Sequence, residues 1–248
     1  ALVHAARNGY MWTLEPKPDG KIEFVDAKPY VHQDVFTSID PETGRPEYDK
    51  SKIPGIGRKA EFCPSLWGGK DWPPAAFSPK TGMLYVPAQE NLCGHLTGKE
   101  ETYKPGQLFL TAAISDIGLT LKDKKVSHIG EVQAWKIGSH EKVWQHDFEF
   151  PTWGPMMATA GDLVFAGGTN DRFFRAFDAK TGKVLWKMRT NSGITAVPSS
   201  FEVDGKQYIA VQSGWGVDAQ RMQDGIDKIF GTKTYVPQGG MIWVFALE

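Results

Sequence analysis

The chain has 248 residues, of which 41% are hydrophobic and 12% aromatic, so it can bury a substantial core. Its 28 basic and 29 acidic residues give a formal net charge of -1 at pH 7, which gives no reason to expect a nucleic acid as partner. No apolar run approaches the roughly 18 to 20 residues of a membrane span. The first residues also lack the pattern of a secretory signal peptide.

The N-terminal segment, residues 1–29, predicts a strand hairpin. Apolar runs at 10–14 and 22–24 flank the turn sequence Pro-Lys-Pro-Asp-Gly-Lys. A polar, turn-rich connection follows at 30–62, and it contains no motif with a chemistry of its own. The sequence begins inside a strand pattern, so we expect the early strands of this first unit to be missing.

The middle of the chain contains a loop, a hairpin and an insertion. Residues 63–72 (CPSLWGGKDW) combine glycines with aromatic side chains, which favours a buried loop near a ligand. The sequence at 77–86 predicts another hairpin. Residues 91–128 form a long insertion without a clear pattern, and insertions of this length between strands are usually functional loops or partner contacts.

The stretch 151–186 predicts one nearly complete four-stranded unit. Short apolar runs bounded by turn sequences are typical of strands joined by hairpins rather than of helices. Here the turn sequences are Gly-Asp, Gly-Gly-Thr-Asn-Asp and Asp-Ala-Lys-Thr-Gly-Lys. The four predicted strands are 156–160, 163–166, 173–177 and 184–186.

The same order of strand, turn, strand and Trp occurs more than once. Residues 130–144 end on Trp144, and 151–186 end on Trp186, 42 residues later (186 minus 144). A period of about 40 to 45 residues is typical of β-propeller blades. We expect Trp144 and Trp186 to dock neighbouring blades, each burying roughly 150 to 250 Å². In the first copy, Phe24 is predicted to take the position of the Trp.

The last copy covers residues 194–213, with Asp204-Gly205 as its hairpin signal, and continues at 241–247. Between these two parts, the loop 217–234 has a helical pattern over 219–230. We expect this loop to form a lid.

Together the copies predict an all-β fold, a β-propeller of about four blades. Their approximate bounds are 1–36, 63–150, 151–192 and 193–248. Propellers usually close with 4 to 8 blades around a channel, and an open arc would expose unpaired strand edges and an apolar face. We therefore expect this chain to be the C-terminal part of a single, larger propeller domain.

Five motifs in a fixed order carry a resemblance to a known family. They are Ala6-Arg-Asn-Gly9 before a strand, the loop 63–72, Phe150-Pro-Thr-Trp-Gly154, the repeat AFDAKTGKVLW at 176–186, and Ser213-Gly-Trp-Gly216. With them the chain resembles the quinoprotein alcohol dehydrogenases, the methanol and ethanol dehydrogenase group that uses pyrroloquinoline quinone (PQQ). The resemblance covers essentially the whole chain, but only the C-terminal half of the family's catalytic domain. It implies an eight-bladed propeller with PQQ on its axis, a Ca²⁺ or lanthanide ion beside it, and an Asp base that assists oxidation of the alcohol.

The resemblance gives roles to two charged residues. Arg7 takes the position of the family's Arg or Lys that contacts the quinone oxygens, where a fixed cation stabilises negative charge on the reduced quinone. Without the resemblance, Arg7 is a surface residue beside a turn. Asp71 takes the position of an Asn that hydrogen-bonds PQQ. A carboxylate near an anionic tricarboxylate costs free energy unless it is protonated or paired, and Lys70 is the partner we expect.

Three tryptophans are also implied in the cofactor site. Trp153 matches the Trp that abuts PQQ in the family, and Trp215 matches the one over the substrate cavity. Trp72 is adjacent to Asp71 and either packs against the edge of the cofactor or belongs to the core.

Cys63 and Cys93 are the only cysteines in the chain. An even count in an exported protein favours one disulfide, and by the resemblance the pair matches a bridge of the methanol dehydrogenases. A metal site with His95 is the alternative, although two Cys and one His lack the spacing of a zinc site. The expected disulfide implies an oxidising compartment, here the periplasm. No Cys-x-x-Cys-His occurs, so no covalent c-type haem is expected on this chain.

The function implied by the resemblance is part of a PQQ-dependent alcohol dehydrogenase. It oxidises alcohols to aldehydes and passes electrons to an external acceptor such as a cytochrome c. The ion's ligands and the catalytic Asp are expected outside this chain, so the N-terminal half of the propeller is a partner, as a second chain or as a missing segment. The alternatives are a non-catalytic propeller scaffold in protein assembly and a carbohydrate-binding propeller, for which the insertion offers only Tyr103 and Phe109 as aromatic platforms.

Overall fold

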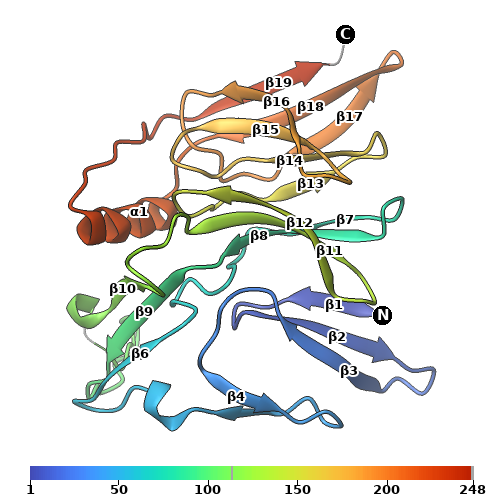
Figure 1. Cartoon of the computed structure of the whole chain (residues 1–248). Helices are drawn as coiled ribbons and strands as arrows, with labels where there is room; N and C mark the ends of the chain where they lie inside the picture. The colour runs from blue at the N-terminus through green and yellow to red at the C-terminus, as the bar shows by residue number, and fades with distance from the viewer. Residues whose placement is uncertain (113, 247–248) are drawn as a thin grey trace. The chain divides into compact units, whose positions relative to one another are not determined.

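The computed structural model describes residues 1–112 and 114–246, and most of its regular structure is strand (Figure 1). The chain forms two compact units. The first contains Ala1–Asp71 and Glu90–Val126, and the second contains Trp72–Gln89 and Ser127–Glu248. Among the described residues, no helix is both long enough and apolar enough to cross a membrane.

The first unit begins with an antiparallel sheet in the order β1-β2-β3. Its strands are β1 (Leu2–Ala5), β2 (Tyr10–Pro16) and β3 (Ile22–Pro29). The turn between β2 and β3 contains Gly20 with a φ of +83°, a conformation that glycine adopts without steric cost. The hairpin predicted for the N-terminal segment is confirmed.

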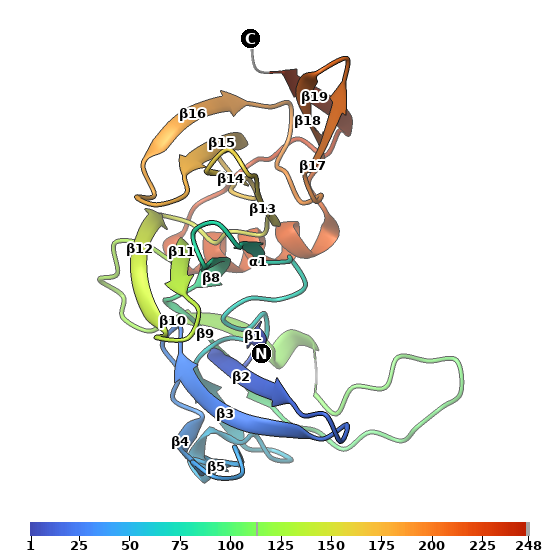
Figure 2. The same ribbon diagram turned by 90° about the vertical axis from the view of Figure 1, so that its right-hand side faces the viewer.

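A second sheet of the first unit, in the order β10-β9-β6, was not predicted. The remaining elements of this unit are β4 (Phe36–Ile39), β5 (Pro46–Tyr48), η1 (Lys50–Lys52), β6 (Lys59–Phe62), β9 (Leu92–Thr97), η2 (Ile114–Asp116) and β10 (Gly118–Leu121). The insertion therefore supplies two of the three strands of this sheet. Between β9 and β10, residues 99–112 extend away from the strands of the unit (Figure 2).

The second unit contains three sheets. The first has the order β12-β11-β8-β7 and is built from β7 (Ala76–Ser78), β8 (Met83–Gln89), β11 (Gly130–Lys136) and β12 (Glu141–Phe148). The hairpin predicted at 77–86 is β7–β8, and the repeat copy that ends on Trp144 is β11–β12. Both predictions are confirmed.

The stretch 151–186 folds into four consecutive, neighbouring strands, as predicted. They are β13 (Met156–Ala158), β14 (Leu163–Ala166), β15 (Phe173–Asp178) and β16 (Val184–Arg189). In each pair the strands run antiparallel, joined by the turn sequences that separate the apolar runs.

The last sheet has the order β17-β18-β19, with β17 (Ser199–Val203), β18 (Lys206–Ser213) and β19 (Met241–Ala246). Asp204 and Gly205 have φ values of +51° and +74°, as a two-residue hairpin turn requires. The helix predicted within 217–234 is α1 (Val217–Phe230), which ends at Gly231 in the left-handed conformation. Leu247 of the predicted last strand lies outside the described residues.

The two inner strands of the β13–β16 sheet, β14 and β15, are buried on both faces, whereas β16 is largely exposed. Val164 and Phe177 pack with Trp144 in one hydrophobic cluster, toward the sheet with the order β12-β11-β8-β7. Phe165 and Phe174 pack in another cluster, toward the β17–β19 sheet. Because successive residues of a strand point to opposite faces, the continuous apolar runs of this stretch fill two cores. Sheets stacked face to face in this way are the arrangement expected of propeller blades.

Trp144 docks two sheets, as predicted. It is 8% exposed, its Nε1 donates to the Ala179 carbonyl at 3.0 Å, and its ring stacks on Phe177. Trp186 contacts the next sheet through Phe245, with ring centroids 5.0 Å apart, but remains 39% exposed. Trp186 is therefore less buried than Trp144.

The structure corrects the assignment of Phe24. Trp144 and Trp186 each immediately follow the extra residue of a β-bulge in their hairpin. In the β2–β3 hairpin this place belongs to Asp26, and Phe24 lies on the other side of the bulge. The prediction was wrong because the β2–β3 hairpin extends farther beyond its bulge. The pair next to the bulge is Thr13 and Asp26, 13 residues apart, whereas Ala134 and Trp144, and Ala176 and Trp186, are each 10 residues apart.

Candidate functional site

Arg7 occupies the turn between β1 and β2. The turn is closed by main-chain hydrogen bonds, from the Ala6 N–H to the Tyr10 carbonyl at 2.8 Å and from the Gly9 N–H to the Ala6 carbonyl at 3.1 Å. The Asn8 side chain accepts the N–H of Tyr10 at 3.1 Å. Gly9 has a φ of +90°, which the turn requires and which favours glycine. Residues 6–9 therefore present Arg7 on a rigid turn.

The guanidinium of Arg7 is held by the loop 63–71 of the same unit. Its Nε donates to the Leu66 carbonyl at 2.8 Å, Nη2 donates to the same oxygen, and Nη2 lies 3.1 Å from Asp71 Oδ2. The Arg7 side chain remains 58% exposed. Among the described residues, none accepts a hydrogen bond from Nη1. Arg7 thus has a fixed side and a side that is available to a ligand.

The expected partner of Asp71 was wrong. Lys70 Nζ donates to the main-chain carbonyl of Asp71 at 2.8 Å, while the Asp71 carboxylate pairs with Arg7. Because Lys70 directly precedes Asp71, its side chain must fold back along the backbone. Its Nζ then reaches the main-chain carbonyl of Asp71 and not the carboxylate. The cation that reaches the carboxylate comes from a distant turn that the loop packs against.

Two glycines make that packing possible. A Cβ on Gly68 would lie 2.3 Å from Arg7 Cγ, and Gly68 has a φ of +74°. A Cβ on Gly69 would lie 2.6 Å from a methyl carbon of Val31. The Gly69 N–H donates to the Arg7 carbonyl at 2.9 Å. The backbone of this loop can approach Arg7 so closely only because both positions lack a side chain.

The Cys63–Cys93 disulfide is confirmed, and it fixes the start of the same loop to β9. The alternative of a metal site with His95 is excluded because both sulfurs are in the disulfide. The Cys63 N–H donates to Asp34 Oδ1 at 2.7 Å, and Asp34 Oδ2 pairs with Lys52 Nζ at 2.6 Å. The loop is therefore anchored both covalently and through a carboxylate.

Two cationic groups near Arg7 have lowered pKa values. Burial lowers the pKa of Lys70, and the neighbouring Asp71 opposes this shift. Burial and the charge of Lys70 lower the pKa of His4. Tyr30 donates to the Ala6 carbonyl at 2.8 Å, and burial raises its pKa well above 10.0. Both of these shifts, the lowered pKa of His4 and the raised pKa of Tyr30, favour the neutral side chain at pH 7.

In the second unit, Trp215 has an unsatisfied donor. It is 5% exposed, and its Nε1 is buried with no acceptor among the described residues. The indole packs on Gly193, where a Cβ would lie 2.0 Å from a ring carbon. A recess of about 330 Å³ beside Trp215 is lined by Thr195, Gln212 and Gln238, among others. Buried donors without a partner are rare in proteins, so this N–H points to an acceptor supplied by a ligand or water.

A buried hydroxyl network holds the segment that carries Trp215. Ser213 Oγ lies 3.0 Å from Thr190 Oγ1 and accepts the N–H of Ser192 at 3.1 Å. The Ser192 hydroxyl donates to the Pro237 carbonyl. The end of β18 is thereby tied both to the turn at 190–194 and to the segment after α1.

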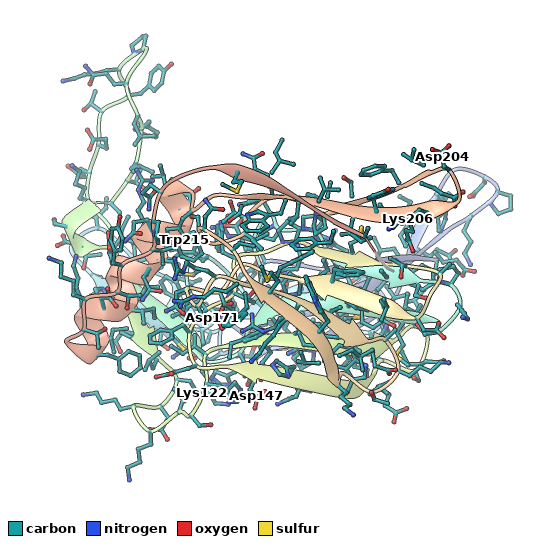
Figure 3. All side chains as sticks on the ribbon, turned by 90° about the horizontal axis from the view of Figure 1, so that it is seen from above. Lys122, Asp147, Asp171, Asp204, Lys206 and Trp215 are labelled. Atoms are coloured by element: carbon teal, nitrogen blue, oxygen red, sulfur yellow. A yellow bond between two sulfur atoms is a disulfide. The ribbon has the colours of Figure 1, made fainter. Side chains whose placement is uncertain are left out.

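Helix α1 follows Trp215, away from the hairpin tip that carries Asp204 and Lys206 (Figure 3). Asp227 anchors the segment after the helix: it accepts the N–H of Thr234 at 2.6 Å, the Thr232 hydroxyl at 2.8 Å and the Gln223 amide at 3.0 Å. Burial alone raises the pKa of Asp227, but these hydrogen bonds outweigh it and the pKa lies below its usual value of 3.8. The role of this region as a lid stays a prediction.

The other two predicted tryptophans differ in exposure. Trp153 is 2% exposed, and its main-chain N–H donates to the Gly168 carbonyl at 2.8 Å. At this contact the backbones of Gly154 and Gly168 meet, since a Cβ on Gly168 would lie 1.9 Å from the Gly154 nitrogen. Trp72 is 51% exposed, so it is not a core residue of the described chain.

Two groups of potential metal ligands occur among the described residues, and the protein itself uses both. His32 and Asp34 lie near Cys63, whose sulfur is in the disulfide. In the other group, the buried Glu131 accepts from the Gln133 amide at 2.7 Å and lies 2.7 Å from His128 Nε2. In each of these two groups, at least one of the potential ligand atoms is already bonded to another group of the protein.

Comparison with known proteins identifies relatives along the entire chain. The domain described as "Glucose/ethanol/alcohol dehydrogenase, beta-propeller domain" matches residues 112–209. A quinoprotein ethanol dehydrogenase of Pseudomonas putida is 38% identical over 100% of this chain and 39% of its own length. The resemblance to the quinoprotein alcohol dehydrogenases is confirmed.

Other relatives are methanol dehydrogenases. A lanthanide-dependent methanol dehydrogenase of Methylacidiphilum fumariolicum is 35% identical over 100% of this chain and 42% of its own length. The structure of a europium-containing methanol dehydrogenase superposes with a TM-score of 0.84 at 35% identity, covering 99% of this chain and 44% of that one. The chain thus has the fold of part of a PQQ propeller, and it spans about two fifths of the length of the curated relatives it matches.

Arg7 and Trp215, each taken within its own unit, fit PQQ in their chemistry. In the first unit, the exposed Arg7 guanidinium has an Nη1 that no described residue occupies and that can donate to a carbonyl or carboxylate oxygen. In the second unit, the Trp215 Nε1–H has no acceptor among the described residues and can donate to an oxygen of the same kind. The pairing of Asp71 with Arg7 also removes the objection to a carboxylate at this position, because the carboxylate is already neutralised by a cation.

Sequence reasoning missed two parts of the site. The Leu66 carbonyl is a main-chain group, and no side-chain pattern marks it as a partner of Arg7. The Gly68-Gly69 pair was noticed as part of a motif, and its double glycine is the signal that could have indicated a close approach of two backbones.

Proposed function

We propose that this chain forms part of a PQQ-dependent alcohol dehydrogenase that oxidises alcohols to aldehydes. The similarity to quinoprotein ethanol dehydrogenases over 100% of the chain carries the proposal. The site adds support, because the residue at the position expected for the quinone contact, Arg7, is held rigidly and retains an available Nη1.

The residues of this chain would bind and orient the cofactor. Arg7 would donate from Nη1 to a quinone oxygen and provide a fixed cation there, with Asp71 beside it. Trp72, which is 51% exposed, would pack against PQQ, while Trp153, which is only 2% exposed, would support the site from within the fold. The Nε1 of Trp215 would donate to a bound oxygen at the substrate side. When bound, PQQ supplies the redox chemistry by accepting two electrons and two protons from the alcohol.

The wider setting of the reaction belongs to the same proposal. A Ca²⁺ or lanthanide ion would be held by ligands outside this chain, in the N-terminal half of the propeller. An external acceptor such as a cytochrome c would take the electrons. The Cys63–Cys93 disulfide supports a periplasmic location, because disulfides persist in oxidising compartments.

The test uses the full-length protein that carries this chain, reconstituted with PQQ and either a calcium or a lanthanide salt. We expect a quinone absorption band and alcohol-dependent reduction of a dye. Replacing Arg7 by Gln should lower kcat by about 100-fold, as expected for loss of a charge-stabilising donor. Arg58→Gln is the control, since Arg58 is a second arginine of the same unit that binds a main-chain carbonyl, that of Ile53. A protein that binds no PQQ with either ion would instead favour the scaffold function.

A further inference from the structure

The loop 63–71 and the Arg7 turn form a small electrostatic assembly. Arg7 and Lys70 each contribute one positive charge and Asp71 one negative charge, which leaves a net charge of +1 (two minus one). Of these, Lys70 is tied to the main-chain carbonyl of Asp71, whereas the Asp71 carboxylate and the Arg7 guanidinium are 3.1 Å apart. The charge of Arg7 is therefore offset at its Nη2 side.

This ion pair is built into the fold. The Asp71 side chain is 20% exposed, and the Leu66 carbonyl fixes the guanidinium from the other direction. The close approach at Gly68 leaves the loop no room to move toward Arg7. A surface pair of two long, mobile side chains contributes little, but here one partner is a short, half-buried carboxylate and the other is held by a second acceptor.

We propose that Asp71 is a positioning residue that sets both the orientation and the effective charge of Arg7 toward the cofactor, and thereby lowers the midpoint potential of bound PQQ. The inference rests on the proposed function and specifies how its site is tuned. Negative charge gathers on the quinone oxygens when the cofactor is reduced, and a cation beside them favours the reduced form. A carboxylate paired with that cation weakens this preference, whereas an uncharged Asn at this position would leave the cation at full strength.

The expected size of the effect follows from the general influence of a nearby charge on an equilibrium. A charge within about 4 to 6 Å of an ionisable group changes its protonation equilibrium by roughly 10- to 1,000-fold. Taking the low end, Asp71→Asn should shift the balance of reduced and oxidised cofactor about tenfold toward the reduced form. For a two-electron couple this is an increase of about 30 mV in the midpoint potential.

The experiment is a spectroelectrochemical titration of PQQ bound to the full-length protein. Asp71→Asn should raise the midpoint potential, Arg7→Gln should lower it, and the double variant should return close to the wild-type value because its net charge is the same. Asp71→Glu keeps the charge and should stay near wild type. Asp19→Asn is the matched control: Asp19 pairs with Lys21 at the same distance, 3.1 Å, in the β2–β3 turn, and its loss should leave the potential unchanged.

The outcomes separate this proposal from the function on which it rests. Wild-type protein that binds no PQQ overturns both. If the wild type binds PQQ but Asp71→Asn leaves the potential unchanged, or if Asp71→Asn abolishes PQQ binding, only the role of Asp71 is overturned. A midpoint potential that is equal in Arg7→Gln and in the double variant also overturns it, because Asp71 would then contribute no charge at the site.

Discussion

The Ala179 carbonyl joins two neighbouring sheets and allows a quantitative test of how they dock. It follows β15 and accepts two side-chain donors, the Tyr85 hydroxyl of β8 and Trp144 Nε1 of β12, each at 3.0 Å. Ala179, Tyr85 and Trp144 are 1%, 0% and 8% exposed. Removing one donor leaves the carbonyl satisfied by the other, whereas removing both leaves a buried acceptor without a partner.

The magnitudes follow from this geometry. Tyr85→Phe loses hydrogen bonds with a net value of about 1 to 2 kcal/mol. Trp144→Phe loses one hydrogen bond and part of the buried ring, in total about 2 kcal/mol. The double variant should lose a further 1 to 2 kcal/mol, approximately, beyond the sum, because an unsatisfied buried carbonyl carries its full desolvation cost.

The assay is a double-mutant cycle by urea unfolding of the full-length protein, followed by circular dichroism. Val143→Ala combined with Tyr85→Phe is the control pair, since Val143 precedes Trp144 on the same strand but is 40% exposed. This pair should be additive within about 0.5 kcal/mol. If Tyr85→Phe and Trp144→Phe are equally additive, the carbonyl is not the shared acceptor on which the sheets depend, and the reasoning is refuted.

Three further predictions concern other parts of the chain. Replacing Cys63 and Cys93 by Ser should lower the free energy of unfolding by about 3 to 4 kcal/mol in the chain-entropy account. A reducing agent should lower the free energy of unfolding of the wild type to the same value. A wild type that keeps its full stability after reduction of the disulfide would contradict this. The pKa of Asp227 lies below its usual value of 3.8 in the folded protein, so the stability that its carboxylate contributes is present above that pH and is lost as the pH falls further. Between about pH 5 and pH 2, the free energy of unfolding should therefore fall less for Asp227→Asn than for the wild type. Parallel profiles of the free energy of unfolding against pH would show that the hydrogen bonds do not stabilise the charged carboxylate. Gly168→Ala should lower the free energy of unfolding by at least about 2 kcal/mol more than Gly138→Ala does. Both positions have positive φ, but only at Gly168 would a Cβ lie 1.9 Å from a backbone nitrogen. Equal thermal stability of the two variants would exclude the close contact.

Much of the fold follows from local sequence chemistry. The runs at 163–166 and 173–177 are strands because apolar residues fill both faces and turn residues bound them, and Asp204-Gly205 makes a hairpin because both residues tolerate positive φ. The failure at Phe24 shows the limit of this reasoning. Spacing along the chain does not reveal where a bulge places the extra residue, because that depends on how the two strands pair.

The candidate site divides in the same way. The positions of Arg7, Trp153 and Trp215 were predicted from motifs, while their roles toward the cofactor stay predictions. The partner of Asp71 was not predictable, because the loop 63–71 must first fold against a turn that lies far away in the sequence. Two acceptors then compete for the nearby cations, and only the folded loop decides that Lys70 reaches a carbonyl.

The sequence by itself determined the repeat of about 42 residues, the strand and turn chemistry within it, and the two cysteines that form the disulfide. These depend on interactions between near neighbours or on a single pair of residues. Only the tertiary structure decided which cation offsets Asp71, which carbonyl fixes Arg7 and which donors share Ala179. The physical reason is that a hydrogen bond or ion pair forms over about 3 Å, so its partner is chosen by how distant loops pack, and that choice leaves no trace in the local pattern.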